Sequence, residues 1–310
     1  MNRKDFLRSV GLASAGVAVS TTGAFAQNNK KTGPADLKGK TALITGAARG
    51  IGLGIAVDLA KQGVNIALLD LADETGGMAI KGYRLANQSE LDSAAEEVKK
   101  LGVKAMAIKA DVRNLDAMKR AADKTISELG SLDIVVANAG VASWSPFEDM
   151  QEDQWKDVID VNLTGVANTV WASIPQMKKQ KSGSIITISS IGGRQGVPGV
   201  ANYASTKWAV IGLTKTLSLE LGKYNIRVNS IAPTAVNTPL YRSEGQYGST
   251  GMSSFEDQDN AMIGYHALPT PALDPVDIAR SATFLASDNS KFVSGLVLDV
   301  AAGGNARYTG

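Results

Sequence analysis

Tyr203 and Lys207 are the pair of residues in this sequence best suited to moving a proton. They stand four positions apart in SSIGGRQGVPGVANYASTKWAV, a helical pattern that places both on one face. A tyrosine normally titrates near about 10, and a neighbouring ammonium stabilises the phenolate, so we expect the pKa of Tyr203 to be lowered toward neutral. Ser189 and Ser190 end the preceding strand pattern, and either hydroxyl could hold a substrate oxygen beside the phenol. A surface Tyr/Lys pair without a role is the alternative.

A second candidate site is the glycine-rich turn TGAARGIG, which runs from Thr45 to Gly52 between an apolar run and a helical pattern. Glycine lacks a Cβ and allows a phosphate to approach the backbone closely. The first amides of the following helix have no intrahelical partners, so the turn predicts an anion site that suits a dinucleotide pyrophosphate. The spacing of Gly46, Gly50 and Gly52 differs from G-x-G-x-x-G, and a turn that serves only packing is the alternative.

The elements that would position these residues alternate regularly from residue 37 onward. Strand patterns occupy residues 41–44, 64–69, 103–109, 132–137, 184–189, 226–231 and 296–300, with helical patterns in nearly every interval. This alternation predicts an α/β fold with a doubly wound parallel sheet in a single domain over residues 37–310. A helix is expected at 91–101. Two long intervals, an insertion at 74–91 and a segment at 238–274, are predicted to be lids over a ligand.

Composition excludes several classes of function. The net charge is +2, and residues 1–26, with three basic residues and one acidic residue, account for all of it. The remainder is neutral, which argues against nucleic acid and anionic membrane surfaces as partners. The chain has no cysteine and a single histidine, so we predict no disulfide and no metal site. His266 is interpreted as a solvated or hydrogen-bonded loop residue.

Residues 1–26 are predicted to be an export leader. A charged start, NRKDFLRSVG, precedes a mildly apolar stretch, and Ala24-Phe25-Ala26 has the A-x-A cleavage pattern before Gln27. RKDFLR resembles a twin-arginine motif in which Lys4 replaces the second arginine. Residues 27–36 would be a short linker, and the mature protein would be periplasmic, or cytoplasmic if the leader is not functional. No other segment is apolar enough to span a membrane.

From about residue 37 to residue 304 the chain resembles the short-chain dehydrogenase/reductase family. The family's T-G-x-x-x-G-x-G motif matches the glycine turn, and its N-A-G motif matches Asn138-Ala139-Gly140. The family serine, 13 residues before the tyrosine, falls on Ser190, and the family asparagine falls on Asn162 in DVNLTG. The resemblance implies a Rossmann fold with seven parallel strands, a homotetramer, and hydride transfer between a nicotinamide and an alcohol or carbonyl compound.

A finer resemblance is to the carveol-dehydrogenase-like subgroup, often called mycofactocin-associated. It has an insertion after the second strand, and its P-T dipeptide matches Pro233-Thr234. Its members resemble enzymes that hold NAD so tightly that it does not exchange freely, which would require an external electron acceptor. One departure is Ala301, which stands where the family ending D-x-G has aspartate.

The resemblance assigns roles to individual residues. Tyr203 would take the hydroxyl proton, Ser190 would orient the substrate oxygen, Lys207 would also bind the nicotinamide ribose, and Asn162 would support a water relay. The implied cofactor contacts are Gly46, Arg49, Gly50, Ile51, Gly52, Asp70, Asp111, Val112, Asn138, Ala139, Gly140, Tyr203, Lys207, Pro233, Val236 and Thr238.

The expected cofactor is NAD rather than NADP. Asp70 ends the second strand, where a carboxylate binds the ribose 2′-hydroxyl and repels a 2′-phosphate. Arg49 is a contrary sign, because relatives with a basic residue in the glycine turn often use NADP.

The substrate would be a small apolar secondary alcohol or ketone, with candidate contacts Trp144, Tyr241, Met252, Phe255 and Met262, which could equally be ordinary lid packing. Three alternatives remain open at this point. They are an NADPH-dependent carbonyl or 3-oxoacyl reductase, a sugar or polyol dehydrogenase, and a non-catalytic dinucleotide-binding protein.

Overall fold

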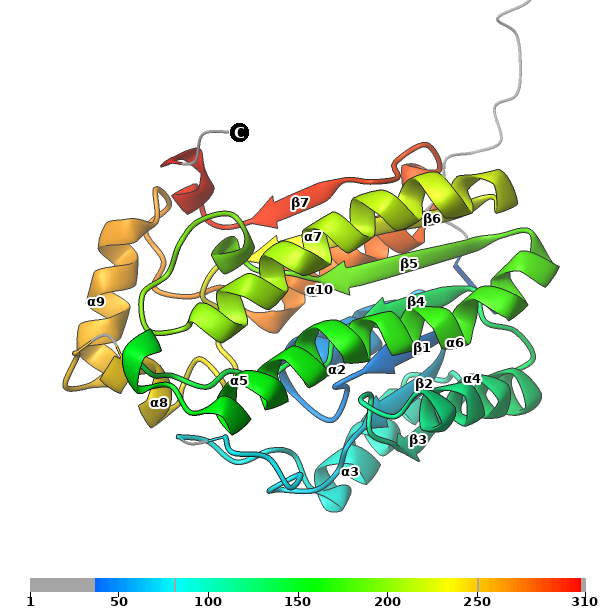
Figure 1. Cartoon of the computed structure of the whole chain (residues 1–310). Coiled ribbons are helices and arrows are strands. Elements are labelled where there is room, and N and C mark those ends of the chain that lie inside the picture. Colours follow the sequence, from blue (N-terminus) through cyan, green and yellow to red (C-terminus); the bar gives the residue numbers. More distant parts are fainter. Residues whose placement is uncertain (1–36, 81, 250, 308–310) are drawn as a thin grey trace, which may run out of the picture. The chain divides into compact units, whose positions relative to one another are not determined.

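Seven parallel strands form one sheet in the order β3-β2-β1-β4-β5-β6-β7 (Figure 1). The computed structural model describes residues 37–80, 82–249 and 251–307, so the predicted leader and linker lie outside the described residues. The strands are β1 (Thr41–Thr45), β2 (Asn65–Asp70), β3 (Ala105–Lys109), β4 (Ile134–Ala137), β5 (Gly183–Ile188), β6 (Ile226–Pro233) and β7 (Val297–Val300). The predicted Rossmann-type α/β fold is confirmed, with each strand within about two residues of its expected position.

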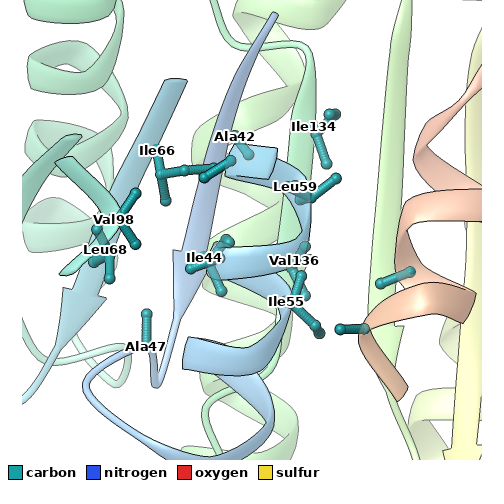
Figure 2. Close-up of a cluster of buried hydrophobic side chains, with 14 of the residues drawn as sticks. Ala42, Ile44, Ala47, Ile55, Leu59, Ile66, Leu68, Val98, Ile134 and Val136 are labelled. Carbon is teal, nitrogen blue, oxygen red and sulfur yellow. The ribbon is translucent and has the colours of Figure 1, made fainter. Parts of the chain in front are cut away.

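Helices cover both faces because successive residues of each strand point to opposite sides. From β1 and β2, Ile44 and Leu68 pack with Ile55 and Leu59 of the helix α2 (Gly50–Lys61) (Figure 2). Leu43 of β1 and Ala67 and Leu69 of β2 point to the opposite face and belong to a second core. The helices that share the first core with α2 are α3 (Gln88–Lys99) and α10 (Pro275–Ala286), and those on the other face are α4 (Leu115–Leu129), α6 (Gly165–Gln180) and α7 (Ala201–Leu221).

The functional edge of the sheet follows from the strand order. Chain order reverses between β1 and β4, which pair in parallel with Leu43 opposite Val135. Ligands of open parallel sheets bind beyond the carboxyl ends of the strands at such a reversal. The glycine turn leaves β1 at this point, and the segment with α8 (Glu244–Ser249) and α9 (Phe255–Tyr265) lies at the same edge, at the left of Figure 1.

The insertion at 74–91 ends inside α3, which begins three residues earlier than the predicted helix at 91–101. The reason is a capping box. The Asn87 side chain accepts from the Glu90 amide (3.0 Å), and Glu90 accepts from the Asn87 amide (2.9 Å). These bonds satisfy amides at the helix start that would otherwise lack partners, so the helix extends upstream of its apolar residues. Within the described residues, no helix is long and apolar enough to cross a membrane.

Candidate active site

Ser190, Tyr203 and Lys207 lie in the wall of one cavity of about 520 Å³ at the carboxyl ends of the strands. Ser190 follows β5, and its Oγ accepts a hydrogen bond from the Gly192 amide (3.0 Å) at the start of a short turn. In this position the hydroxyl faces Tyr203. The two candidate serines are thereby distinguished. Ser189 is buried and donates to the Lys207 carbonyl (2.8 Å), so its hydroxyl serves the packing of α7.

The expected lowering of the Tyr203 pKa is wrong for the protein by itself. Burial raises the pKa of Tyr203, and a hydrogen bond with Ser190 opposes the rise only in part. The Lys207 ammonium is 5.3 Å from the centre of the phenol ring and donates to the Ile188 carbonyl (2.8 Å) rather than to the phenol oxygen. Burial also lowers the pKa of Lys207 to about 8. Desolvation therefore outweighs the ammonium here, because both groups are removed from water together.

Asn162 lies behind the cavity rather than in its wall. It sits in a π-helical turn (Asp160–Thr164) that joins α5 (Glu152–Ile159) to α6. Its amide binds the Val141 backbone twice, accepting from the nitrogen (2.8 Å) and donating to the oxygen (2.9 Å), and also reaches Thr206. These contacts fix the end of the β4 loop next to Lys207. A role for Asn162 in a water relay stays a prediction.

The glycine turn has the geometry of an anion site. Gly46 and Gly50 adopt positive φ angles of 64° and 60°, which suit glycine. The described helix α2 has no side-chain cap at Arg49 and no acidic residue in its first turn, so its first amides are available to an anion. Gly52 has another purpose: a Cβ there would overlap with the Gly46 carbonyl oxygen, so this glycine allows close packing within the turn and does not line the cavity.

Asp70 and Arg49 face the expected adenosine side of the cavity. The Asp70 carboxylate accepts from the amides of Ala48 (3.1 Å) and Ala72 (3.4 Å), and burial raises the pKa of Asp70. Arg49 is engaged by the insertion, since its guanidinium donates to the Arg84 carbonyl and lies 3.7 Å from Glu90. Glu90 also accepts two hydrogen bonds from Arg84 (2.6 and 2.9 Å), and the pKa of Glu90 is lowered to about 2.

The predicted cofactor contacts form a continuous surface. All of them except Gly52 belong to the wall of the 520 Å³ cavity, from Asp70 and Asp111 past the glycine turn to Tyr203 and Lys207. Open helix amides suit a pyrophosphate, a carboxylate suits a ribose hydroxyl, and a buried ammonium suits a second ribose. The residues present therefore fit a nicotinamide dinucleotide. The described residues contain no cluster of three His, Asp or Glu side chains able to hold a metal ion.

The other half of the cavity is lined by several apolar side chains. Of the five predicted substrate contacts, Trp144, Tyr241 and Met262 line it, whereas Met252 and Phe255 do not. Phe255 packs its ring against Tyr247 instead (5.0 Å between centres). The wall also includes residues that the sequence did not suggest, among them four polar or aromatic ones from segments distant in the chain: Tyr83, Gln195, Gln246 and Tyr265. The sequence shows that these side chains are aromatic or carry an amide. It does not show that they meet at one cavity, because this depends on how the loops that hold them fold.

The insertion and the segment at 238–274 meet over this apolar half. The Tyr83 ring contacts Trp144 edge-on, with 5.8 Å between ring centres, and its hydroxyl accepts from the Ala142 amide (3.3 Å). A Cβ on Gly82 would lie 2.7 Å from the backbone of Gly245 in α8. The two segments are thus in direct backbone contact, so neither moves away from the cavity without disturbing the other.

His266 and Ala301 are buried outside the cavity wall and contribute to the packing of the fold. His266 is buried, with Nε2 bonded to the Thr234 hydroxyl (2.8 Å) and Nδ1 to the Thr270 carbonyl (2.6 Å), as expected for a hydrogen-bonded histidine. Ala301 is buried and cannot replace the family aspartate. Two residues earlier, Asp299 pairs with Arg194 (3.1 Å) in the segment after Ser190, so a carboxylate still ties that segment to β7.

Known proteins are similar to this chain in sequence and in fold. The short chain dehydrogenase family profile matches residues 40–247. The (-)-trans-carveol dehydrogenase of Rhodococcus erythropolis is 39% identical over 276 residues, which cover 87% of this chain and 98% of the relative. A 3-oxoacyl-[acyl-carrier-protein] reductase of Staphylococcus epidermidis is 38% identical over 264 residues, covering 85% and 98% of the two chains.

Among solved structures, carveol dehydrogenase from Mycobacterium avium in complex with NAD superposes with a TM-score of 0.84 at 36% identity. The match covers 88% of this chain and 100% of that one. Because the family profile covers most of the domain and full-length relatives exceed 30% identity, the cavity with Ser190, Tyr203 and Lys207 can be assigned to a class of enzyme. The chain belongs to the short-chain dehydrogenase/reductase family of oxidoreductases.

Proposed function

We propose that the protein transfers a hydride between NAD and a small, apolar secondary alcohol or its ketone. The observation that carries this proposal is the convergence of Ser190, Tyr203 and Lys207 on the wall of a cavity that also contains the open amino terminus of α2. The relatives support it, because two of them are named as carveol dehydrogenases and one of these was solved with NAD.

In the oxidation direction, Tyr203 accepts the proton of the substrate hydroxyl as the carbon gives up its hydride. The Ser190 hydroxyl, held toward Tyr203 by the Gly192 amide, orients the substrate oxygen. Bound oxidised nicotinamide would supply the hydride acceptor at C4 and a positive charge close to the phenol. Lys207 would bind the ribose of the nicotinamide and carries a second positive charge below a pH of about 8. Both charges would favour the phenolate that burial alone disfavours.

Tyr203→Phe should reduce kcat by about 100- to 10,000-fold, the usual value of general acid/base catalysis, because it removes the proton-accepting oxygen. The thermal midpoint and the cofactor affinity should stay close to wild type, since the ring remains. Steady-state turnover and calorimetric binding measure the two effects. Tyr224→Phe is the matched control, because Tyr224 lies outside the cavity wall. A Tyr203→Phe enzyme that kept more than about a tenth of wild-type kcat would contradict the role.

NAD is favoured over NADP by the contacts of Asp70 and Arg49. A 2′-phosphate beside the Asp70 carboxylate would meet a like charge. Arg49, which could otherwise neutralise that phosphate, is held by Glu90 and the Arg84 carbonyl. Arg49 therefore does not favour NADP here, because Glu90 of the insertion pairs with the guanidinium that would otherwise bind the 2′-phosphate.

Wild-type protein should bind NAD at least about tenfold more tightly than NADP, and Asp70→Ala should reduce this ratio, since about 1.4 kcal/mol of repulsion corresponds to tenfold. Affinities of both dinucleotides measured by calorimetry provide the test. Asp73→Ala is the control, because its carboxylate accepts hydrogen bonds from the local turn at Thr75 and Gly76 and does not line the cavity. A wild type that prefers NADP would show the assignment to be wrong.

We further propose that NAD is retained through catalysis, with reoxidation by an external electron acceptor, as in the mycofactocin-associated enzymes that the chain resembles. The support is the anchoring of the insertion over the cavity. The Ala79 amide donates to Asp157 (2.6 Å), Arg113 donates to the Gly76 carbonyl (2.9 Å), and Tyr83 contacts Trp144. Opening a path for the dinucleotide would require breaking several of these contacts together.

After purification and extensive dialysis, the denatured protein should release nearly one NAD per chain, with turnover supported by an artificial electron acceptor. Tyr83→Ala should release less, because it removes the ring that meets Trp144, whereas Tyr224→Ala should match wild type. Chromatography of the released dinucleotide gives the ratio. Empty wild-type protein that turns over rapidly on added NAD would exclude retention while leaving the dehydrogenase activity intact.

We propose that the protein is exported to the periplasm by a twin-arginine-type route, which carries folded proteins and would allow NAD to be loaded beforehand. The support lies in the sequence of residues 1–26, outside the described residues.

A homotetramer is also proposed. Its support is the exposure of Trp171 on α6 (59%) and Trp208 on α7 (52%), large aromatic side chains on adjacent helices of one face.

Fractionated cells should contain a processed periplasmic protein that begins near Gln27, because the A-x-A pattern ends at Ala26. Mass spectrometry of the mature amino terminus checks the cleavage site. Replacing Arg3 and Lys4 with glutamine should leave unprocessed protein in the cytoplasm. An uncleaved wild-type product in the cytoplasm would rule out export.

A further inference from the structure

A second, outer cavity of about 820 Å³ adjoins the one described above. Trp144, Val197 and Pro198 belong to the walls of both cavities, so these three residues separate the two. The inner cavity contains the reacting groups, and the outer one opens between the loop after β4, the segment before α7, and α8. The outer cavity is therefore placed to receive whatever part of a substrate extends away from its carbinol carbon.

The Trp144 indole is the largest side chain in this partition, and its position depends on Gly245. A Cβ on Gly245 would overlap with the six-membered ring of the indole, whereas one on Gly82 would make an ordinary contact with it at 3.7 Å. Tyr83 meets the ring edge-on. The indole Nε1 donates to the Gln246 side chain over 3.3 Å, a long hydrogen bond. The ring is thus packed against backbone that only glycine leaves free.

The wall of the outer cavity is apolar. It combines four glycines with the rings and methyl groups of the following residues: Trp144, Pro146, Phe147, Val197, Pro198 and Ala201. Among the described residues that form this wall, the ionisable ones are Glu148 and Glu244, both exposed carboxylates. An uncharged hydrocarbon group would be stabilised in such a site by burial. An anionic group would meet two negative charges and no cation from the wall.

We infer that the outer cavity is a subsite for the uncharged, apolar remainder of a secondary alcohol, and that Trp144 determines how long or bulky that remainder can be. This inference rests on the proposed function and adds a substrate class to it. It also distinguishes the protein from reductases of acyl groups on anionic carriers. The phosphate groups of such a carrier would have to pass Glu148 and Glu244.

The test is a series of 2-alkanols of increasing chain length, each assayed for kcat/KM with wild type, Trp144→Ala and Phe147→Ala. Removing the indole joins the two cavities, so Trp144→Ala should raise kcat/KM for long alcohols relative to 2-butanol by about tenfold, the typical effect of reshaping a hydrophobic pocket. Phe147→Ala removes apolar wall from the outer cavity alone and should lower kcat/KM for long alcohols more than for short ones.

Further variants keep the test decisive. Phe292→Ala removes an aromatic side chain that is 90% exposed and lines neither cavity, so its chain-length profile should match wild type. If Trp144→Ala fails to fold, Gly245→Ala displaces the same indole by contact and should also change the chain-length profile.

Alcohols that end in a carboxylate should react at least about tenfold more slowly than neutral alcohols of equal length. The double variant Glu148→Gln and Glu244→Gln should reduce this difference in rate.

The outcomes separate the inference from the proposed function. Wild-type protein without activity on any secondary alcohol would contradict the function. Activity on 2-alkanols with the same chain-length profile in wild type, Trp144→Ala and Gly245→Ala would overturn the subsite while the function stands. Equal rates with neutral and carboxylate-ended alcohols would refute the assigned chemistry of the wall.

Discussion

The side-chain amide of Asn138 joins the ends of β1 and β4, the two strands between which the chain order reverses. The geometry of the site depends on these hydrogen bonds. The Nδ2 of Asn138 donates to the carbonyls of Thr45 (2.8 Å) and Gly46 (3.1 Å), while the Thr45 hydroxyl accepts from the amides of Asn138 (3.0 Å) and Ala139 (3.1 Å). These bonds fix the turn after β1 against the end of β4. The open amides of α2 thereby face the same cavity as the loop that leads to Trp144.

Burial governs the chemistry of the catalytic pair more than their proximity does. Residues four apart on a helix share a face, and the sequence correctly brought Tyr203 and Lys207 to one cavity. It did not reveal that Lys207 would donate to the Ile188 carbonyl, or that both side chains would lie deep enough for desolvation to dominate their pKa values. The protein interior disfavours both charged forms, so positive charge from a bound nicotinamide would favour the phenolate.

The fold and most of the site could be predicted because they depend on local patterns. Apolar periodicity located the seven strands, the resemblance to the family's motifs located Ser190 and Asn138, and the end of the second strand located Asp70. The misplaced start of α3 shows where such reasoning fails: apolar residues marked the helix, but the Asn87–Glu90 capping box begins it. Contacts between distant loops were also beyond the sequence. Glu90 was not recognised as the partner of Arg49, and Tyr83 was not recognised as a neighbour of Trp144, because neither relation follows from spacing.

The insertion after β2 connects two properties that are usually treated separately. At one end, Glu90 and the Arg84 carbonyl hold Arg49 beside the glycine turn, which affects recognition of the dinucleotide. Toward its middle, Gly82 and Tyr83 touch α8 and Trp144, which shape the apolar half of the cavity. One continuous segment therefore contacts both the cofactor side and the substrate side. A change in its sequence would alter both together, so binding of the cofactor and selection of the substrate are expected to be energetically coupled in this protein rather than independent.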